Sequence, residues 1–190
     1  MKPSLVLTGG EYRSRRLFAP EGTDTRPTRA IVREALFNML QGACEGARVL
    51  DLFAGSGALG FEALSRGAIK ATFCDCAARA MAVIRKNAGM LKAAGRCEFL
   101  QLDWHKVLEQ LAAAGQQFDL ILLDPPYEME KAPVMDEILS RRTLAAGGTI
   151  ALEHSSREAV PLLQGTGVFR SRRYGETSIT LITTSSEDPT

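Results

Sequence analysis

The tetrapeptide Asp124-Pro125-Pro126-Tyr127 has the composition of a rigid binding site for a planar amine. It follows an apolar run, residues 118–123, that is typical of a buried strand. The two prolines fix φ and remove two backbone donors, so the Asp124 carboxylate and the Pro125 carbonyl remain as hydrogen-bond acceptors. Tyr127 adds an aromatic face beside them. Paired acceptors next to a flat ring suit a planar group that carries an NH2.

A glycine-rich turn earlier in the chain has the spacing of a nucleotide-binding loop. Gly55, Gly57 and Gly60 follow the apolar residues 49–53 in the pattern G-x-G-x-x-G and precede a helical pattern. Such glycines allow a tight turn and let a ligand approach the backbone at the start of a helix. The same spacing also occurs in loops that only need positive φ, so it does not identify a ligand by itself.

Two acids narrow the class of ligand. Asp51 lies inside the apolar run, and a buried carboxylate must be paired or hydrogen-bonded. A ligand with an ammonium group would supply that pair. Asp75 ends the next apolar run, where an acid commonly accepts hydrogen bonds from a ribose diol. A dinucleotide and S-adenosylmethionine (SAM) both carry a ribose, and Asp51 favours SAM because its methionine part has an amino group.

Four acids fall at or near the carboxyl ends of successive expected strands: Asp51, Asp75, Asp103 and Asp124. Ligands of open α/β sheets bind at the carboxyl ends of the strands, so these side chains should share one edge. Asp103 and Trp104 could hold and cover an adenine there, although a tryptophan packed at the start of a helix accounts for Trp104 equally well.

The elements that must position these residues alternate between strand and helix from residue 47 onward. Apolar runs predict strands at 48–53, 70–75, 97–102, 118–123, 148–153, 167–173 and 178–184. Helical periodicity predicts helices at 58–66, 78–93 and 131–144, with a short one after Asp103. This order predicts an α/β fold with a central, mostly parallel seven-stranded sheet and helices on both faces.

The N-terminal part of the chain is basic. We expect residues 1–42 to form an extension, a hairpin plus a helix, packed on a domain at 43–190. Residues 4–20 predict the hairpin, and Thr28 is a suitable N-cap for a helix that ends near Gly42. Basic side chains gather in this extension and again late in the chain and can contact phosphates, although such clusters are often only solvated: Arg13, Arg15, Arg16, Arg170, Arg172 and Arg173.

The composition is that expected of an ordinary soluble globular domain. The 190 residues carry a net charge of +1 and are 45% hydrophobic, within the range of one globular domain. No run is long enough for a membrane span, and the N-terminus does not resemble a signal peptide. The four cysteines form no C-x-x-C pair, so we expect reduced thiols in a cytoplasmic protein. His105 and His154 are isolated, and no metal site is expected.

The motifs together resemble a known family. Residues 51–57 and the tetrapeptide 124–127 are similar to the two signature motifs of SAM-dependent amino-methyltransferases. Residues 9–13, 26–28 and 33–38 resemble the N-terminal signature of the RsmD family of bacterial small-subunit (16S) ribosomal RNA guanine-N2 methyltransferases, and residues 174–177 match its late hairpin turn. The resemblance covers residues 8 to 182. The chain departs from the family at Cys74-Asp75-Cys76, where a Glu is more usual, but an Asp can still reach a ribose.

This resemblance implies a Rossmann-like class I methyltransferase that uses SAM, yields S-adenosylhomocysteine and needs no metal. It implies that Asp124 and the Pro125 carbonyl orient the guanine NH2, with Pro126 stiffening the loop and Tyr127 stacking on a base taken out of its stack. The implied cofactor residues are Arg26, Thr28, Asp51, Phe53, Ala54, Gly55, Gly57, Asp75, Asp103 and Trp104. The implied RNA-binding residues are Arg13, Arg15, Arg16, Arg172 and Arg173.

Other functions stay open at this point. A DNA or RNA adenine-N6 methyltransferase shares the two enzyme motifs, but a DNA enzyme usually carries a larger target-recognition region. A nicotinamide-dependent oxidoreductase satisfies the glycine spacing and Asp75, but it leaves the tetrapeptide and Asp51 unexplained. An inert RNA-binding protein would not need the intact motif. For the RNA enzyme we expect a monomer, no membrane contact, and ribosomal RNA within an assembling small subunit as partner.

Overall fold

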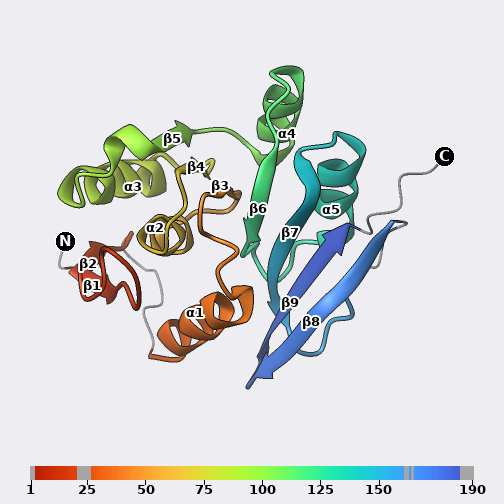
Figure 1. Ribbon diagram of the computed structural model, residues 1–190, viewed down its shortest axis with the longest axis horizontal. Helices are drawn as coiled ribbons and strands as arrows, with labels where there is room; N and C mark the ends of the chain where they lie inside the picture. The colour runs from red at the N-terminus through yellow and green to blue at the C-terminus, as the bar shows by residue number, and fades with distance from the viewer. Residues whose placement is uncertain (1–2, 21–26, 161–162, 164, 185–190) are drawn as a thin grey trace.

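The computed structural model, which describes residues 3–20, 27–160, 163 and 165–184, has a seven-stranded sheet at its centre (Figure 1). The strands of this sheet are β3 (Arg48–Asp51), β4 (Lys70–Cys74), β5 (Cys97–Leu100), β6 (Phe118–Leu123), β7 (Leu144–Ser155), β8 (Thr166–Tyr174) and β9 (Thr177–Thr184). They lie in the order β5-β4-β3-β6-β7-β9-β8. The strands β3 to β7 pair in parallel, whereas β9 is antiparallel to both β7 and β8. The expected mostly parallel sheet is confirmed.

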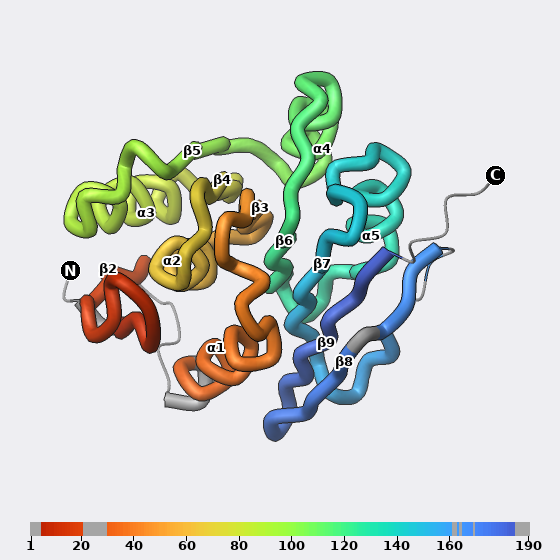
Figure 2. The backbone as a smooth tube through the Cα atoms, in the orientation of Figure 1, coloured from red at the N-terminus to blue at the C-terminus, as the bar shows by residue number. Residues whose placement is uncertain are grey.

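Helices cover both faces of this sheet, as Figure 2 shows along the path of the chain. They are α1 (Pro27–Leu40), α2 (Ala58–Ser65), α3 (Ala78–Met90), α4 (Trp104–Ala113) and α5 (Lys131–Ser140). One buried cluster joins α1, α2 and α3 to strand residues such as Val49 and Leu122. The other joins α4 and α5 to their sequence neighbours Leu50 and Leu123. Since successive strand residues point to opposite faces, these apolar runs build both cores at once.

Several element ends differ from the sequence expectation. Strands β3, β4 and β5 stop before the expected residues 53, 75 and 102, because the chain leaves the sheet there to form loops at its carboxyl edge. Helix α3 ends at Met90 rather than near residue 93, and Lys92 beyond it has φ of 56°. Helix α5 ends at Ser140, and Arg142 after it has φ of 55°. Apolar periodicity continues past both helices because Leu91 and Leu144 are buried although neither is helical.

The N-terminal hairpin is fastened to the sheet domain by a buried acid. Its strands β1 (Pro3–Val6) and β2 (Arg16–Phe18) pair antiparallel. Glu62 of α2 is fully buried and accepts hydrogen bonds from the Thr8 backbone N–H (2.9 Å), the Thr8 hydroxyl (2.7 Å) and the Gly9 N–H (2.8 Å). Arg66 donates to the same carboxylate at 2.8 Å. A buried carboxylate with this many donors fixes the hairpin against α2.

Helix α1 begins at Pro27, so Thr28 lies in its first turn and is not the N-cap that the sequence led us to expect. Proline is favoured at the first helical position because its missing N–H would have no intrahelical partner there. None of the helices among the described residues is long and apolar enough to cross a membrane.

Candidate active site

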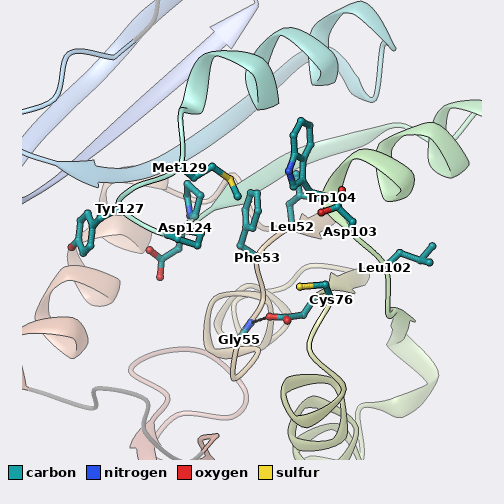
Figure 3. A pocket seen from close by; sticks show the side chains of 13 residues that line it. Leu52, Phe53, Gly55, Cys76, Leu102, Asp103, Trp104, Asp124, Tyr127 and Met129 are labelled. Atoms are coloured by element: carbon teal, nitrogen blue, oxygen red, sulfur yellow. Dashed lines mark hydrogen bonds between the residues drawn. The ribbon is translucent and has the colours of Figure 1, made fainter.

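A cavity of about 350 Å³ opens at the carboxyl edge of the sheet, where β3 lies between β4 and β6 (Figure 3). This is the point at which the strand order reverses and where open α/β sheets bind their ligands. The cavity is lined by Leu52, Phe53, Gly55, Asp75, Cys76, Leu102, Asp103, Trp104, Asp124, Pro125, Pro126, Tyr127 and Met129. The structure therefore brings the glycine turn, the acids after β4, β5 and β6 and the 124–127 tetrapeptide to one place.

The glycines of the turn meet different physical demands. Gly57 has φ of 77°, and a Cβ there would lie 2.7 Å from the Phe61 ring. A Cβ on Gly60 would lie 2.3 Å from the Phe73 ring, so only glycine lets α2 pack this closely on β4. Gly55 has φ of 54° but has open space where its Cβ would be. Gly57 and Gly60 thus serve packing, and Gly55 leaves room at the cavity wall for a ligand.

Asp75 is held in place before any ligand arrives. Its Oδ2 accepts a hydrogen bond from the Gly55 N–H at 2.9 Å, drawn as a dashed line in Figure 3. Its Oδ1 accepts one from the Ala77 N–H at 2.8 Å. Each carboxylate oxygen can still accept a further bond. The side chain therefore offers a fixed acceptor at the cavity wall, as a ribose diol requires.

Asp51 lies beneath the turn and does not line this cavity. It is almost fully buried, and its Oδ2 accepts a hydrogen bond from the Gly60 N–H at 2.9 Å. Its Oδ1 has no hydrogen-bond partner among the described residues. Burial raises the pKa of this carboxyl to about 7, with smaller contributions from Asp124 and Asp75, while the Gly60 bond acts in the opposite direction. The protein itself thus supplies one of the partners that a buried acid needs.

The two candidate adenine residues are placed differently. Asp103 is the N-cap of α4, where its carboxylate accepts the His105 N–H at 3.0 Å. Trp104 follows it at the start of the helix and is half-buried in the cavity wall. Figure 3 shows Phe53 between the 124–127 loop and the Trp104 ring. The cavity therefore has aromatic and apolar walls with a few carboxylates, as small-molecule sites do.

Asp124 lies between two hollows. Besides the main cavity it lines a smaller one of about 100 Å³, which the Phe53–Ser56 turn also borders. The N-terminal extension reaches this second hollow through Leu5 of β1 and Arg33 of α1. A group held by Asp124 would thus lie where the turn, the tetrapeptide and the N-terminal extension meet.

Tyr127 is exposed but fixed at both ends. Its hydroxyl lies 3.1 Å from the Thr177 Oγ1 at the start of β9. Its backbone carbonyl accepts a hydrogen bond from the Lys131 ammonium at 2.9 Å. The turn at residues 174–177 therefore contacts the tetrapeptide, although it is far from it in sequence.

Sequence reasoning missed three polar residues that shape the site. Arg33 is buried beside Glu62, and burial lowers the pKa of its guanidinium. Asn87 is buried on α3 and donates to the carbonyls of Ser56 (3.1 Å) and Phe18 (3.0 Å), which ties the glycine turn to β2. Lys131 is buried at the start of α5. A polar residue on the apolar side of a helical pattern is the signal that could have identified Asn87.

The two arginine clusters lie at different distances from the cavity. The hairpin turn packs on the end of α2, where the Glu11 N–H donates to the Ser65 carbonyl at 2.7 Å. Arg13 and Arg15 are exposed on this turn, at the opposite end of α2 from the glycine turn. Arg16 is also exposed and begins β2.

Arg172 and Arg173, by contrast, are exposed near the end of β8, whose last residue Tyr174 pairs with Thr177. The structure thus brings the second cluster toward the cavity and leaves the first away from it. Arg26 lies outside the described residues, and of Thr28 only the backbone is described. Within the described ranges no cluster of His, Cys, Asp or Glu could hold a metal ion.

The chain is similar in sequence and in structure to proteins named as methyltransferases. A family model described as "Conserved hypothetical protein 95" matches residues 5–183. YlbH of Bacillus subtilis, a candidate rRNA methyltransferase by its name, is 35% identical over 177 residues, covering 92% of this chain and 96% of that protein. Ribosomal RNA small subunit methyltransferase D of Escherichia coli is 39% identical over 121 residues, covering 64% of this chain and 59% of its own. The solved structure of the Escherichia coli protein yhhF, described as a candidate methyltransferase, has a TM-score of 0.85 at 30% identity, covering 96% of this chain and 99% of that one.

Proposed function

Because the chain belongs to the RsmD family of ribosomal RNA small-subunit methyltransferases, we propose that it methylates the exocyclic N2 amine of a guanine. The fold is that of a class I methyltransferase, and the protein is a SAM-dependent rRNA methyltransferase. The assignment of guanine N2 as the methylated atom is more specific than the assignment to this family. It is supported by the position of Asp124 between the two hollows, with Tyr127 beside it.

The residues around the cavity fit SAM. Gly55 leaves open space at the wall, and Asp75 offers acceptors for the ribose hydroxyls. Trp104 and Phe53 would border the adenine, and Asp103 would lie at its rim. Asp51 lies beneath the glycine turn, and its Oδ1, which has no hydrogen-bond partner among the described residues, would attract the ammonium group of the methionine part. The remaining proposed contacts come from the turn residues Ala54 and Gly57 and from the motif residues Arg26 and Thr28.

Asp124 would act on the target amine through hydrogen bonding and charge. The lone pair of a guanine NH2 is delocalised into the ring, which makes it a poor nucleophile. Hydrogen bonds from the NH2 to the Asp124 carboxylate and the Pro125 carbonyl would localise that lone pair and fix its direction. The carboxylate would also stabilise the positive charge that develops on the nitrogen as it gains the methyl group supplied by SAM. Tyr127 would stack on the flipped base.

Arg13, Arg15, Arg16, Arg172 and Arg173 would bind the RNA backbone. The exposed face of α3 would continue the surface of the hairpin, because Arg79 and Lys86 are exposed on it and residues 76–97 contain no acid. Figure 1 shows α3 beside β5 and β4 and the hairpin next to α2 and α3, all on the other side of the molecule from β8. An RNA that touched both clusters would contact Arg172 and Arg173 beside the carboxyl edge and the hairpin arginines at the far end of α2. We propose a monomer that acts on RNA in an assembling small subunit.

The proposal is tested by methylating small subunits from a strain that lacks this enzyme, with tritiated SAM. Nucleoside analysis of the product should give N2-methylguanosine at one position. Labelled N6-methyladenosine would favour the adenine-N6 alternative. Binding of NADH without binding of SAM would favour the oxidoreductase.

A further inference from the structure

Tyr127 is highly exposed, yet hydrogen bonds hold both its backbone carbonyl and its hydroxyl. This combination suggests that its ring is held in one orientation. The side chain is 54% exposed, so packing alone does not hold it. We propose that Lys131 and Thr177 are positioning residues that hold Tyr127 in the orientation needed to receive the target base. The inference rests on the proposed function, because it gives Tyr127 the stacking role described above.

Lys131 fixes the backbone of the tetrapeptide. It is only 3% exposed, and its ammonium donates to the Tyr127 carbonyl at 2.9 Å while lying 2.9 Å from Glu158 Oε2. A buried charge costs free energy that an apolar residue of the same size would avoid. Lys131 instead provides a geometric constraint, because its ammonium, at the start of α5, joins the tetrapeptide to Glu158 in the segment after β7.

Thr177 fixes the far end of the ring. Its Oγ1 lies 3.1 Å from the Tyr127 hydroxyl. The residue begins β9, pairs with Ser155 at the end of β7 and with Tyr174 at the end of β8. The neighbouring Glu176 carbonyl accepts the Ser156 N–H at 2.8 Å. The hydroxyl of Tyr127 is therefore attached to a part of the sheet that three strands hold in place.

These two contacts leave the ring face free while restricting rotation about its side-chain bonds. A bond at the carbonyl and a bond at the hydroxyl lie at opposite ends of the residue, and neither covers the ring. A ring ordered before the base arrives lowers the entropy cost of reaching a reactive arrangement. Loss of either contact should therefore reduce the rate of methyl transfer more than SAM affinity.

A double-mutant cycle with single-turnover kinetics tests the Thr177 contact. Thr177→Val and Tyr127→Phe should each slow methyl transfer by about 3- to 10-fold, the effect of one hydrogen bond. The double variant should be no slower than Tyr127→Phe alone. Thr177→Ser keeps the hydroxyl and should retain most of the rate. Losses that multiply in the double variant would overturn the proposal, since Thr177 would then act independently of Tyr127.

A second cycle tests Lys131. Lys131→Met has similar length without the charge and should slow transfer by about 10- to 100-fold, as for a bond to a charged group. Glu158→Gln should have a smaller effect in the same direction. In a Tyr127→Ala background, where no ring remains to be oriented, Lys131→Met should cause no further loss. A further loss there would contradict the proposal. SAM affinity, read from the fluorescence of Trp104, the single tryptophan, should stay near the wild-type value.

Ring motion gives a readout that does not depend on activity. In NMR spectra of protein with labelled tyrosines, Thr177→Val should shift the Tyr127 ring signals and speed ring rotation, whereas Thr177→Ser should not. Unchanged ring signals in Thr177→Val would overturn the proposal even if the enzyme were inactive on every RNA tested. An inactive wild-type enzyme that binds SAM would count against the proposed function instead.

Discussion

The Oδ2 of Asp75 accepts a hydrogen bond from the backbone N–H of Gly55 at 2.9 Å. This bond joins the acid after β4 to the glycine turn after β3, so two walls of the cavity are fixed relative to each other. Asp75→Ala should weaken SAM binding by roughly 1–3 kcal/mol, because polar groups lose their acceptor. Asp75→Asn keeps one acceptor oxygen and should lose less. Isothermal titration calorimetry checks both values, and equal SAM affinity in Asp75→Ala would remove Asp75 from the cofactor site.

Asp51 should make stability depend on pH. Its pKa is about 7 in the folded protein, above the ordinary value of 3.8, so the folded state binds more protons than the unfolded state between those values. The free energy of unfolding should therefore fall as pH rises from about 4 to 7. Asp51→Asn can still accept the Gly60 N–H and should remove this component. The difference in melting temperature between wild type and Asp51→Asn, followed from pH 5 to 8, measures it, and a difference that does not vary with pH would contradict the burial of the charge.

Cys76 should report on the cavity. It is the exposed one among the four free cysteines and lines the cavity beside Asp75. Burial raises the pKa of the Cys44 and Cys97 thiols to about 11, which keeps them protonated and slow to react. A thiol reagent should therefore label Cys76 first, and SAM should slow that labelling. Cys76→Ser should remove the fast phase. Labelling at the same rate with saturating SAM would mean that the ligand does not occupy this cavity.

The architecture was largely predictable from sequence because buried parallel strands and amphipathic helices leave strong patterns. The strand before Asp124 was predicted with its observed bounds, and the strand that ends at Asp51 was predicted two residues too long, because both faces of each strand are apolar. What the sequence could not give is the partner of each polar group. The pairing of Glu62 with Thr8 and the contact of Tyr127 with Thr177 join segments more than 45 residues apart, and no local pattern encodes them. The residues that could form the site were therefore identifiable from the sequence, whereas the contacts that hold them in place could be found only in the folded structure.

The hairpin arginines should serve RNA binding and not SAM binding. Changing Arg13, Arg15 and Arg16 to Gln together should weaken RNA binding and reduce its salt slope, since fewer counterions are released. A matched control changes Arg48, Lys70 and Arg142 to Gln. These three residues lie at the amino ends of the strands or just before them, away from the cavity. The control alters net charge equally and should change the slope less. Equal slopes for the two triple variants would mean that the hairpin arginines are only a solvated surface.

Two substitutions separate the role of the Tyr127 ring from that of its hydroxyl. Tyr127→Phe keeps the stacking face and should be mild, whereas Tyr127→Ala should reduce turnover severely. Binding of SAM should be nearly equal in the two variants, because the ring is proposed to contact the base. Single-turnover rates with saturating RNA and SAM distinguish them. Equal rates for Tyr127→Phe and Tyr127→Ala would show that the ring does not stack on the base.

The most direct test of the account is the single-turnover rate of Asp124→Ala and Asp124→Asn on saturating RNA and SAM. Asp124→Ala should bind SAM nearly as well as wild type and transfer the methyl group about 10²- to 10³-fold more slowly, as after loss of one preorganised group in the transition state. If hydrogen bonding dominates, Asp124→Asn should retain more activity than Asp124→Ala. If the negative charge dominates, the two variants should be equally slow. An unchanged rate in Asp124→Ala would contradict the central claim that this carboxylate orients the target amine.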